Sequence, residues 1–170
     1  MATSRAISKQ FLSVLDADRH SALGLVLSAA LPLAVFVIAN GLAEINGMLP
    51  LFFAPFGLPG WVGGVLHLGT LPLLGIARWM VADRGVAGQN AGWWLVALMT
   101  SAIAAPVVLP FADMLVGTMY MTVVALVGLS AMARSAQVSS LAAMLVLPGL
   151  LWIASLALVV FSVVGGGWTP

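Results

Sequence analysis

Residues 91–133 read AGWWLVALMTSAIAAPVVLPFADMLVGTMYMTVVALVGLSAMA and contain a single charged side chain, that of Asp113. One helix of that length would be about 65 Å long at ~1.5 Å per residue, roughly twice the ~30 Å hydrocarbon core of a bilayer. The segment Pro110-Phe111-Ala112-Asp113 lies near the middle of the stretch and supplies a turn. The stretch therefore predicts two transmembrane helices joined by a short hairpin.

Three more apolar stretches lie outside this pair, and each is close to the ~20 residues that a helix needs to cross a membrane. They cover Ala22–Ala43, about Leu58–Ala77 and about Ala142–Val163. Gly88-Gln89-Asn90 is predicted as a turn before the third span. The predicted organisation is a polar N-terminal arm (1–21), a five-helix transmembrane domain (22–164) and a short C-terminal tail (165–170).

The composition supports a membrane setting and excludes several functions. Of the 170 residues, 62% are hydrophobic and 6% are charged, and the mean hydropathy is +1.16. A soluble domain carries about 25% charged residues, so lipid must cover this surface. The net charge of +1 provides no basic face for nucleic acid, and the lack of cysteine excludes disulfides and thiolate chemistry. We expect an all-α integral membrane protein that is not an enzyme.

The basic residues indicate the orientation. With five spans, all six Lys and Arg residues fall on one side of the membrane, and the other two loops and the C-terminus have none. They are Arg5, Lys9, Arg19, Arg78, Arg84 and Arg134. This pattern predicts a cytoplasmic N-terminus and an outside C-terminus, and we expect the bacterial inner membrane.

Small residues recur every fourth position on the third span, at Ala97, Ser101 and Ala105. Such ladders let helix backbones approach closely in lipid. Two interpretations stay open: packing inside the bundle, or the seam of a homodimer.

Few residues suggest chemistry. The two histidines, His20 and His67, are far apart in sequence and have no cysteine or paired carboxylate near them, so no metal site is predicted. His67 lies in the middle of a span, and three interpretations stay open. It bonds a neighbouring helix as a neutral imidazole, meets a polar ligand, or serves as an axial ligand to a haem-like metal. Trp152 lies well inside the last span, and its indole N–H requires a partner.

The proline and tryptophan framework resembles the TspO/MBR family, the tryptophan-rich sensory proteins and the mitochondrial translocator protein. Pro59-Gly60-Trp61-Val62 fits the family motif that opens the second helix, and Gly75-Ile76-Ala77 fits the motif that closes it. Pro148 and Trp152 match the Pro-Tyr-x-x-Trp motif of the fifth helix, with Gly149 in place of Tyr.

Other family positions differ. His67 occupies the place of a second Trp and Leu71 that of a Tyr. In the third helix Pro106 remains, while Ser101 and Ala104 replace an Asn and a Trp. No Tyr follows Tyr120 and no basic residue follows Arg134, so the family's sterol-recognition pattern is absent.

The resemblance implies a cavity among five helices that binds a porphyrin or another flat hydrophobic molecule, in a sensory, regulatory or transport role. By resemblance Trp61, His67, Ser101 and Trp152 line this cavity, and Phe52 and Phe53 of the Pro-containing first loop cover it. No resident cofactor is implied beyond such a porphyrin or haem-type ligand. The alternative is a non-catalytic accessory subunit that packs against a larger membrane complex.

Overall fold

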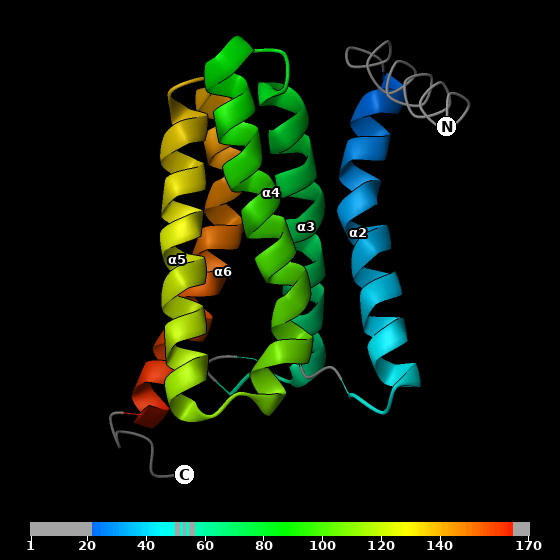
Figure 1. Cartoon of the computed structure of the whole chain (residues 1–170), viewed down its shortest axis with the longest axis vertical. Helices are drawn as coiled ribbons and strands as arrows, with labels where there is room; N and C mark the ends of the chain where they lie inside the picture. The colour runs from blue at the N-terminus through cyan, green and yellow to red at the C-terminus, as the bar shows by residue number, and fades with distance from the viewer. Residues whose placement is uncertain (1–21, 50–51, 53, 55–56, 165–170) are drawn as a thin grey trace, which may run out of the picture.

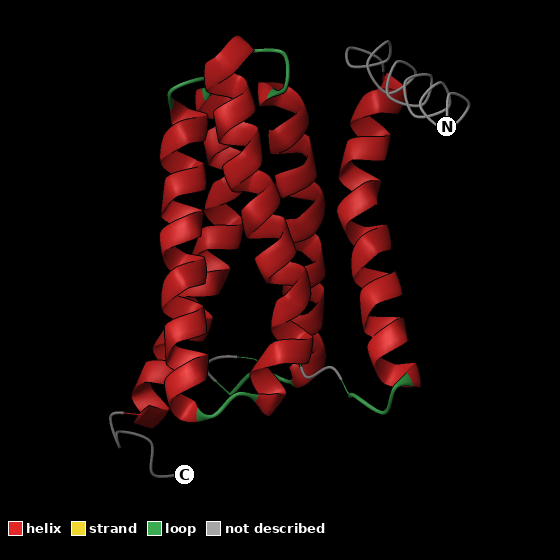
Figure 2. Ribbon diagram, in the orientation of Figure 1, coloured by secondary structure: helices red, strands yellow, loops and turns green. Residues whose placement is uncertain are grey.

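The computed structural model describes residues 22–49, 52, 54 and 57–164. The predicted N-terminal arm (1–21) and C-terminal tail (165–170), together with Phe53, lie outside the described residues. All regular structure in the described part of the chain is helical, as Figure 2 shows.

Five long helices follow one another along the chain (Figure 1). They are α2 (Ala22–Ile45), α3 (Gly60–Val81), α4 (Gly85–Val108), α5 (Met114–Ala136) and α6 (Ser140–Val164). A short 3-10 helix, η1 (Leu109–Phe111), extends α4. All five are long and apolar enough to cross a membrane, which confirms the predicted all-α, five-helix architecture of a multi-pass membrane protein.

The hairpin predicted at Pro110–Asp113 is present. Helix η1 contains Pro110, and the carboxylate of Asp113 caps α5 by accepting a 2.8 Å hydrogen bond from the backbone N–H of Val116. An aspartate at this position satisfies one of the unpaired N–H groups at a helix start. Sequence therefore located this turn correctly.

The turn predicted at Gly88-Gln89-Asn90 is wrong, because these residues belong to α4. The chain reverses earlier, at Gly85, which has a φ of 63° that favours glycine. Gly88 then lies against the backbone carbonyl of Val81, at a separation that leaves no room for a Cβ atom. Glycine serves close helix packing at this position and does not end a helix.

Helices α3, α4, α5 and α6 pack around a common core, and α2 lies beside α3 with fewer contacts to α4. Figure 1 shows α2 on the side of the bundle away from α5. The core includes Leu74, Leu95, Leu98, Met121 and Val146, all nearly or completely buried. Many large apolar side chains of α2 are exposed, including Leu31, Val37 and Ile38. Exposed apolar side chains of this kind suit contact with lipid tails.

One end of the bundle carries the basic residues of the described chain. Arg78 lies in the last turn of α3, Arg84 precedes α4, and Arg134 lies in the last turn of α5. These three helix ends lie at the same end of the molecule, where α2 also begins (Figure 1). We call it the basic end, and the opposite end, which carries Phe52, the loop end.

The small-residue ladder of α4 runs from the surface into the bundle. Ala97 is exposed, Ser101 is half-buried and Ala105 is buried. Residues four apart are offset by about 40° around a helix with ~3.6 residues per turn, so the ladder turns away from the surface. Of the three ladder residues, Ala97 and Ser101 keep exposed surface and Ala105 is covered by the bundle.

Candidate functional site: a small cavity beside His67

His67 lies inside the bundle, with 5% of its surface exposed. Its Nε2 atom is 2.9 Å from the backbone carbonyl oxygen of Ala102 on α4. Its Nδ1 atom is 3.3 Å from Nε1 of Trp152 on α6. One side chain on α3 thus joins three helices by hydrogen bonds.

The carbonyl of Ala102 is available because of Pro106. In a regular α-helix the carbonyl of residue 102 would accept from the N–H of residue 106, but proline has no N–H. An unpaired carbonyl in a membrane interior is costly. The imidazole of His67 satisfies the acceptor that Pro106 leaves free.

The partners of His67 determine which of its nitrogens carries hydrogen. The indole N–H of Trp152 is only a donor, so Nδ1 of His67 must accept. The Ala102 carbonyl is only an acceptor, so Nε2 must donate. His67 is therefore a neutral imidazole protonated at Nε2, and both of its nitrogens are engaged within the chain.

Two phenylalanines cover the imidazole. The ring centroid of Phe36, on α2, is 5.6 Å from that of His67, and the centroid of Phe52, in the first loop, is 6.0 Å away. Phe36 and Phe52 also contact each other, with centroids 6.0 Å apart. Phe52 rests against Gly64, where its Cγ would be 3.7 Å from an added Cβ. These contacts are apolar, because a phenylalanine side chain has no hydrogen-bond donor or acceptor.

A small cavity lies beneath Phe52. Its volume is about 20 Å³, close to the space that one water molecule requires. Its lining comes from the first loop, α3, the α4–η1 segment and α6. The lining residues are Phe52, His67, Ala105, Pro106, Leu109, Trp152 and Leu156.

The predicted site residues are found in different places. The structure brings Phe52, His67 and Trp152 together around the cavity. Trp61 is 71% exposed on the outside of α3. Ser101 does not line the cavity, and its backbone carbonyl accepts a 2.5 Å hydrogen bond from the Tyr120 hydroxyl. Phe53 lies outside the described residues.

Sequence reasoning missed several contributors to the site. Phe36 gave no signal, since one Phe on an apolar helix is an ordinary lipid-facing residue. The free carbonyl of Ala102 could have been predicted from the sequence, because Pro106 follows it by four residues and has no N–H to donate. Ala105, Leu109 and Leu156 are apolar lining that only the three-dimensional packing reveals.

The chemistry that this arrangement supports is binding. The lining contains one titratable side chain, that of His67, and no carboxylate that would act with it. The described residues contain no group of three or more His, Cys, Asp or Glu side chains that would hold a metal ion. Aromatic and aliphatic walls with one polar group are typical of sites for apolar ligands.

Comparison with known proteins found no matching family model, no matching curated protein and no matching solved structure.

Proposed function

We propose that this chain is a non-catalytic, TspO-like membrane protein that binds a flat hydrophobic ligand of the tetrapyrrole class beneath its first loop. A sensory, regulatory or transport role accompanies this binding. The observation that carries the proposal is the meeting of Phe52, His67 and Trp152, from three separate elements, at one cavity. Aromatic walls stack on a flat ligand, and a single imidazole orients its polar edge.

The cavity must expand to hold such a ligand. Its volume is about 20 Å³, whereas pockets for small molecules have volumes of ~300–1,000 Å³. Phe52 is the wall that moves most easily, because it belongs to a loop and is held by ring contacts and by Gly64. Binding of a ligand of this size therefore requires Phe52 to move aside.

The proposal includes an orientation and an oligomeric state. The basic end faces the cytoplasm of a bacterium, because positive residues are retained on that side of an inner membrane. The loop end and its cavity then face outward. Ala97 and Ser101 provide close approach for a second copy of the chain, while Ala105 is buried in the bundle.

The direct test is equilibrium titration of the purified protein in mild detergent with protoporphyrin IX, followed by porphyrin absorbance. We expect saturable binding at one site per chain. Trp152→Leu should weaken it several-fold, because an aromatic contact contributes about 1 kcal/mol beyond area burial. Trp61→Leu is the matched control, since Trp61 is exposed and lies outside the cavity. Equal effects of the two substitutions, or no saturation, would contradict the proposal.

A specific observation favours the alternative, a non-catalytic accessory subunit of a larger membrane complex. Both nitrogens of His67 have partners within the chain, and the cavity holds no more than one water molecule. A core whose polar groups are already paired with one another, and which leaves no room for a ligand, suits a purely structural role. Purification from native membranes separates the two: stoichiometric partner proteins without porphyrin binding would support the accessory role.

A further inference from the structure

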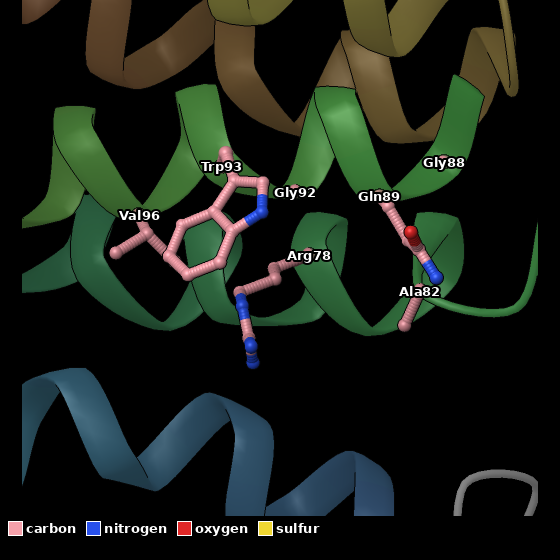
Figure 3. Close-up of a pocket in the computed structure, with 7 residues that line it drawn as sticks. All are labelled: Arg78, Ala82, Gly88, Gln89, Gly92, Trp93 and Val96. Atoms are coloured by element: carbon pink, nitrogen blue, oxygen red, sulfur yellow. The ribbon is translucent and has the colours of Figure 1, made fainter. Parts of the chain in front are cut away.

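A second and larger pocket lies at the basic end, far along the bundle from the His67 cavity. Its volume is about 300 Å³, and it lies between the end of α3 and the start of α4 (Figure 3). Helix α3 contributes Arg78, and Ala82 follows its end. Helix α4 contributes Gly88, Gln89, Gly92, Trp93 and Val96.

Two glycines one turn apart on α4 create this pocket. Gly88 lets α4 approach the end of α3 closely, as its contact with the Val81 carbonyl shows. Gly92 has the opposite surroundings, because no atom lies within 4 Å of the place where its Cβ would be. The open space next to Gly92 is therefore part of the pocket. A side chain at this position would fill the pocket without disturbing the contact between Gly88 and Val81.

The polar groups of the pocket suit an anion. Arg78 is exposed and has no ion-pair partner in the described part of the chain. Its guanidinium is always charged and presents a planar fork of N–H donors that matches phosphate oxygens. The amide of Gln89 and the indole N–H of Trp93 add donors on the facing helix, and Figure 3 shows all three side chains around the same opening.

The pocket also has a polarity gradient along the membrane normal. Gln89 lies near the start of α4, and Trp93 and Val96 lie one and two turns further into the span. Trp93 is 72% exposed, as expected for an indole at the headgroup level. A molecule with an anionic head and an apolar tail would match this order of groups.

We propose that this pocket binds an anionic phospholipid of the surrounding leaflet. The lipid phosphate accepts hydrogen bonds from Arg78, and one acyl chain lies along Trp93 and Val96. Basic pockets between membrane helices are known sites for lipid headgroups, and Arg78 lies in the last turn of α3, where a lipid phosphate would supply a counter-ion that the described residues do not. The proposal is independent of any ligand at the loop end.

The test is native mass spectrometry of the detergent-purified protein with added phosphatidylglycerol. We expect one tightly bound lipid per chain. Arg78→Gln should weaken binding about tenfold or more, the effect expected for loss of a hydrogen bond to a charged group. Arg78→Lys should give an intermediate loss of affinity, because lysine keeps the positive charge but lacks the planar pair of N–H donors of the guanidinium.

Two matched controls distinguish binding in this pocket from non-specific electrostatic attraction of anionic lipid to the basic end. Arg134→Gln removes a charge from the same end but outside the pocket, and it should leave the dissociation constant unchanged within about twofold. Gly92→Leu should abolish binding by filling the pocket, whereas Gly69→Leu, on α3 with equally open surroundings, should not. Thermal melting checks that both glycine variants remain folded.

Three results would overturn the proposal. An equal loss of lipid affinity in Arg134→Gln and Arg78→Gln would show that binding depends only on the net charge of the basic end. Equal binding of phosphatidylcholine would show that the anionic headgroup is not recognised. Displacement of the lipid by inorganic phosphate at equal concentration would assign the pocket to a soluble phosphate compound.

Discussion

Two prolines in this protein leave the same local defect, and the fold resolves the two defects differently. Pro32 in α2 frees the carbonyl of Ser28, and Pro106 in α4 frees the carbonyl of Ala102. The Ala102 carbonyl receives a hydrogen bond from His67. The Ser28 carbonyl instead lies against Gly75 of α3, at a distance that excludes any Cβ atom.

The difference separates the fixed walls of the cavity, on α3, α4 and α6, from its movable wall, Phe52, which packs against α2 through Phe36. Helices α3, α4 and α6 are joined at His67 by two directional hydrogen bonds between buried groups. Helix α2 is joined to α3 by close backbone packing at Gly75 and by the ring of Phe36. Apolar and close-packing contacts have little directional preference, so Phe52 and α2 are the described parts able to move for a ligand.

The largest expected effect tests the α2 contact. Gly75→Val should lower the free energy of unfolding by about 3 kcal/mol, because a side chain would overlap the Ser28 carbonyl and push α2 away. Gly69→Val, on the same helix with no atom near its Cβ position, is the control and should have a much smaller effect. Reversible unfolding in mixed micelles measures both. Equal losses would mean that α2 does not depend on this contact.

The next effect tests the fixed wall. His67→Leu should cost about 1–3 kcal/mol, because it removes two interhelical hydrogen bonds worth about 0.6 kcal/mol on average and leaves their partners unpaired. His67→Gln is the informative companion, since its amide N–H can donate to Ala102 while its carbonyl accepts from Trp152. We expect Gln to retain most of the stability that Leu loses. A Gln variant as unstable as Leu would argue against the hydrogen bonds as the cause.

The smallest expected effect on stability tests whether Pro106 is the reason that the Ala102 carbonyl needs His67. Pro106→Ala restores the backbone N–H that would bond to Ala102, so the carbonyl no longer depends on His67. His67→Leu should therefore cost about 1 kcal/mol less in the Pro106→Ala background than in the wild type. A double-mutant cycle of unfolding free energies measures this coupling. Strict additivity would show that the two residues act independently.

Sequence alone predicts the architecture well for a physical reason. Span length and the near absence of charge follow directly from the bilayer, so five helices and the Pro110 hairpin could be predicted from apolar stretches and a turn. The turn predicted at Gly88 was wrong because glycine also serves close packing, and sequence does not distinguish the two uses. A single-sequence pattern states which residues are small, but not what lies opposite them.

The candidate site could be predicted only in part. His67 stood out as an ionisable residue within a span, and Trp152 as an indole within another, so both were named correctly as interior groups. That they bond to each other depends on the rotation of α3 and α6, which the uniformly apolar helices do not reveal. Trp61 was expected at the cavity but points outward, because a Trp near a span end also serves as an interfacial anchor.

The most direct test of the movable wall is the rate at which protoporphyrin IX associates with the wild type and with Phe52→Ala, measured by stopped-flow absorbance. Phe52 covers the cavity through contacts with Phe36, His67 and Gly64, so in the wild type this ring must move before a ligand enters. Association that requires a conformational change is slow, and removal of the cover should raise the association rate constant about tenfold. An unchanged or lower rate constant for Phe52→Ala would contradict a ligand site beneath the first loop.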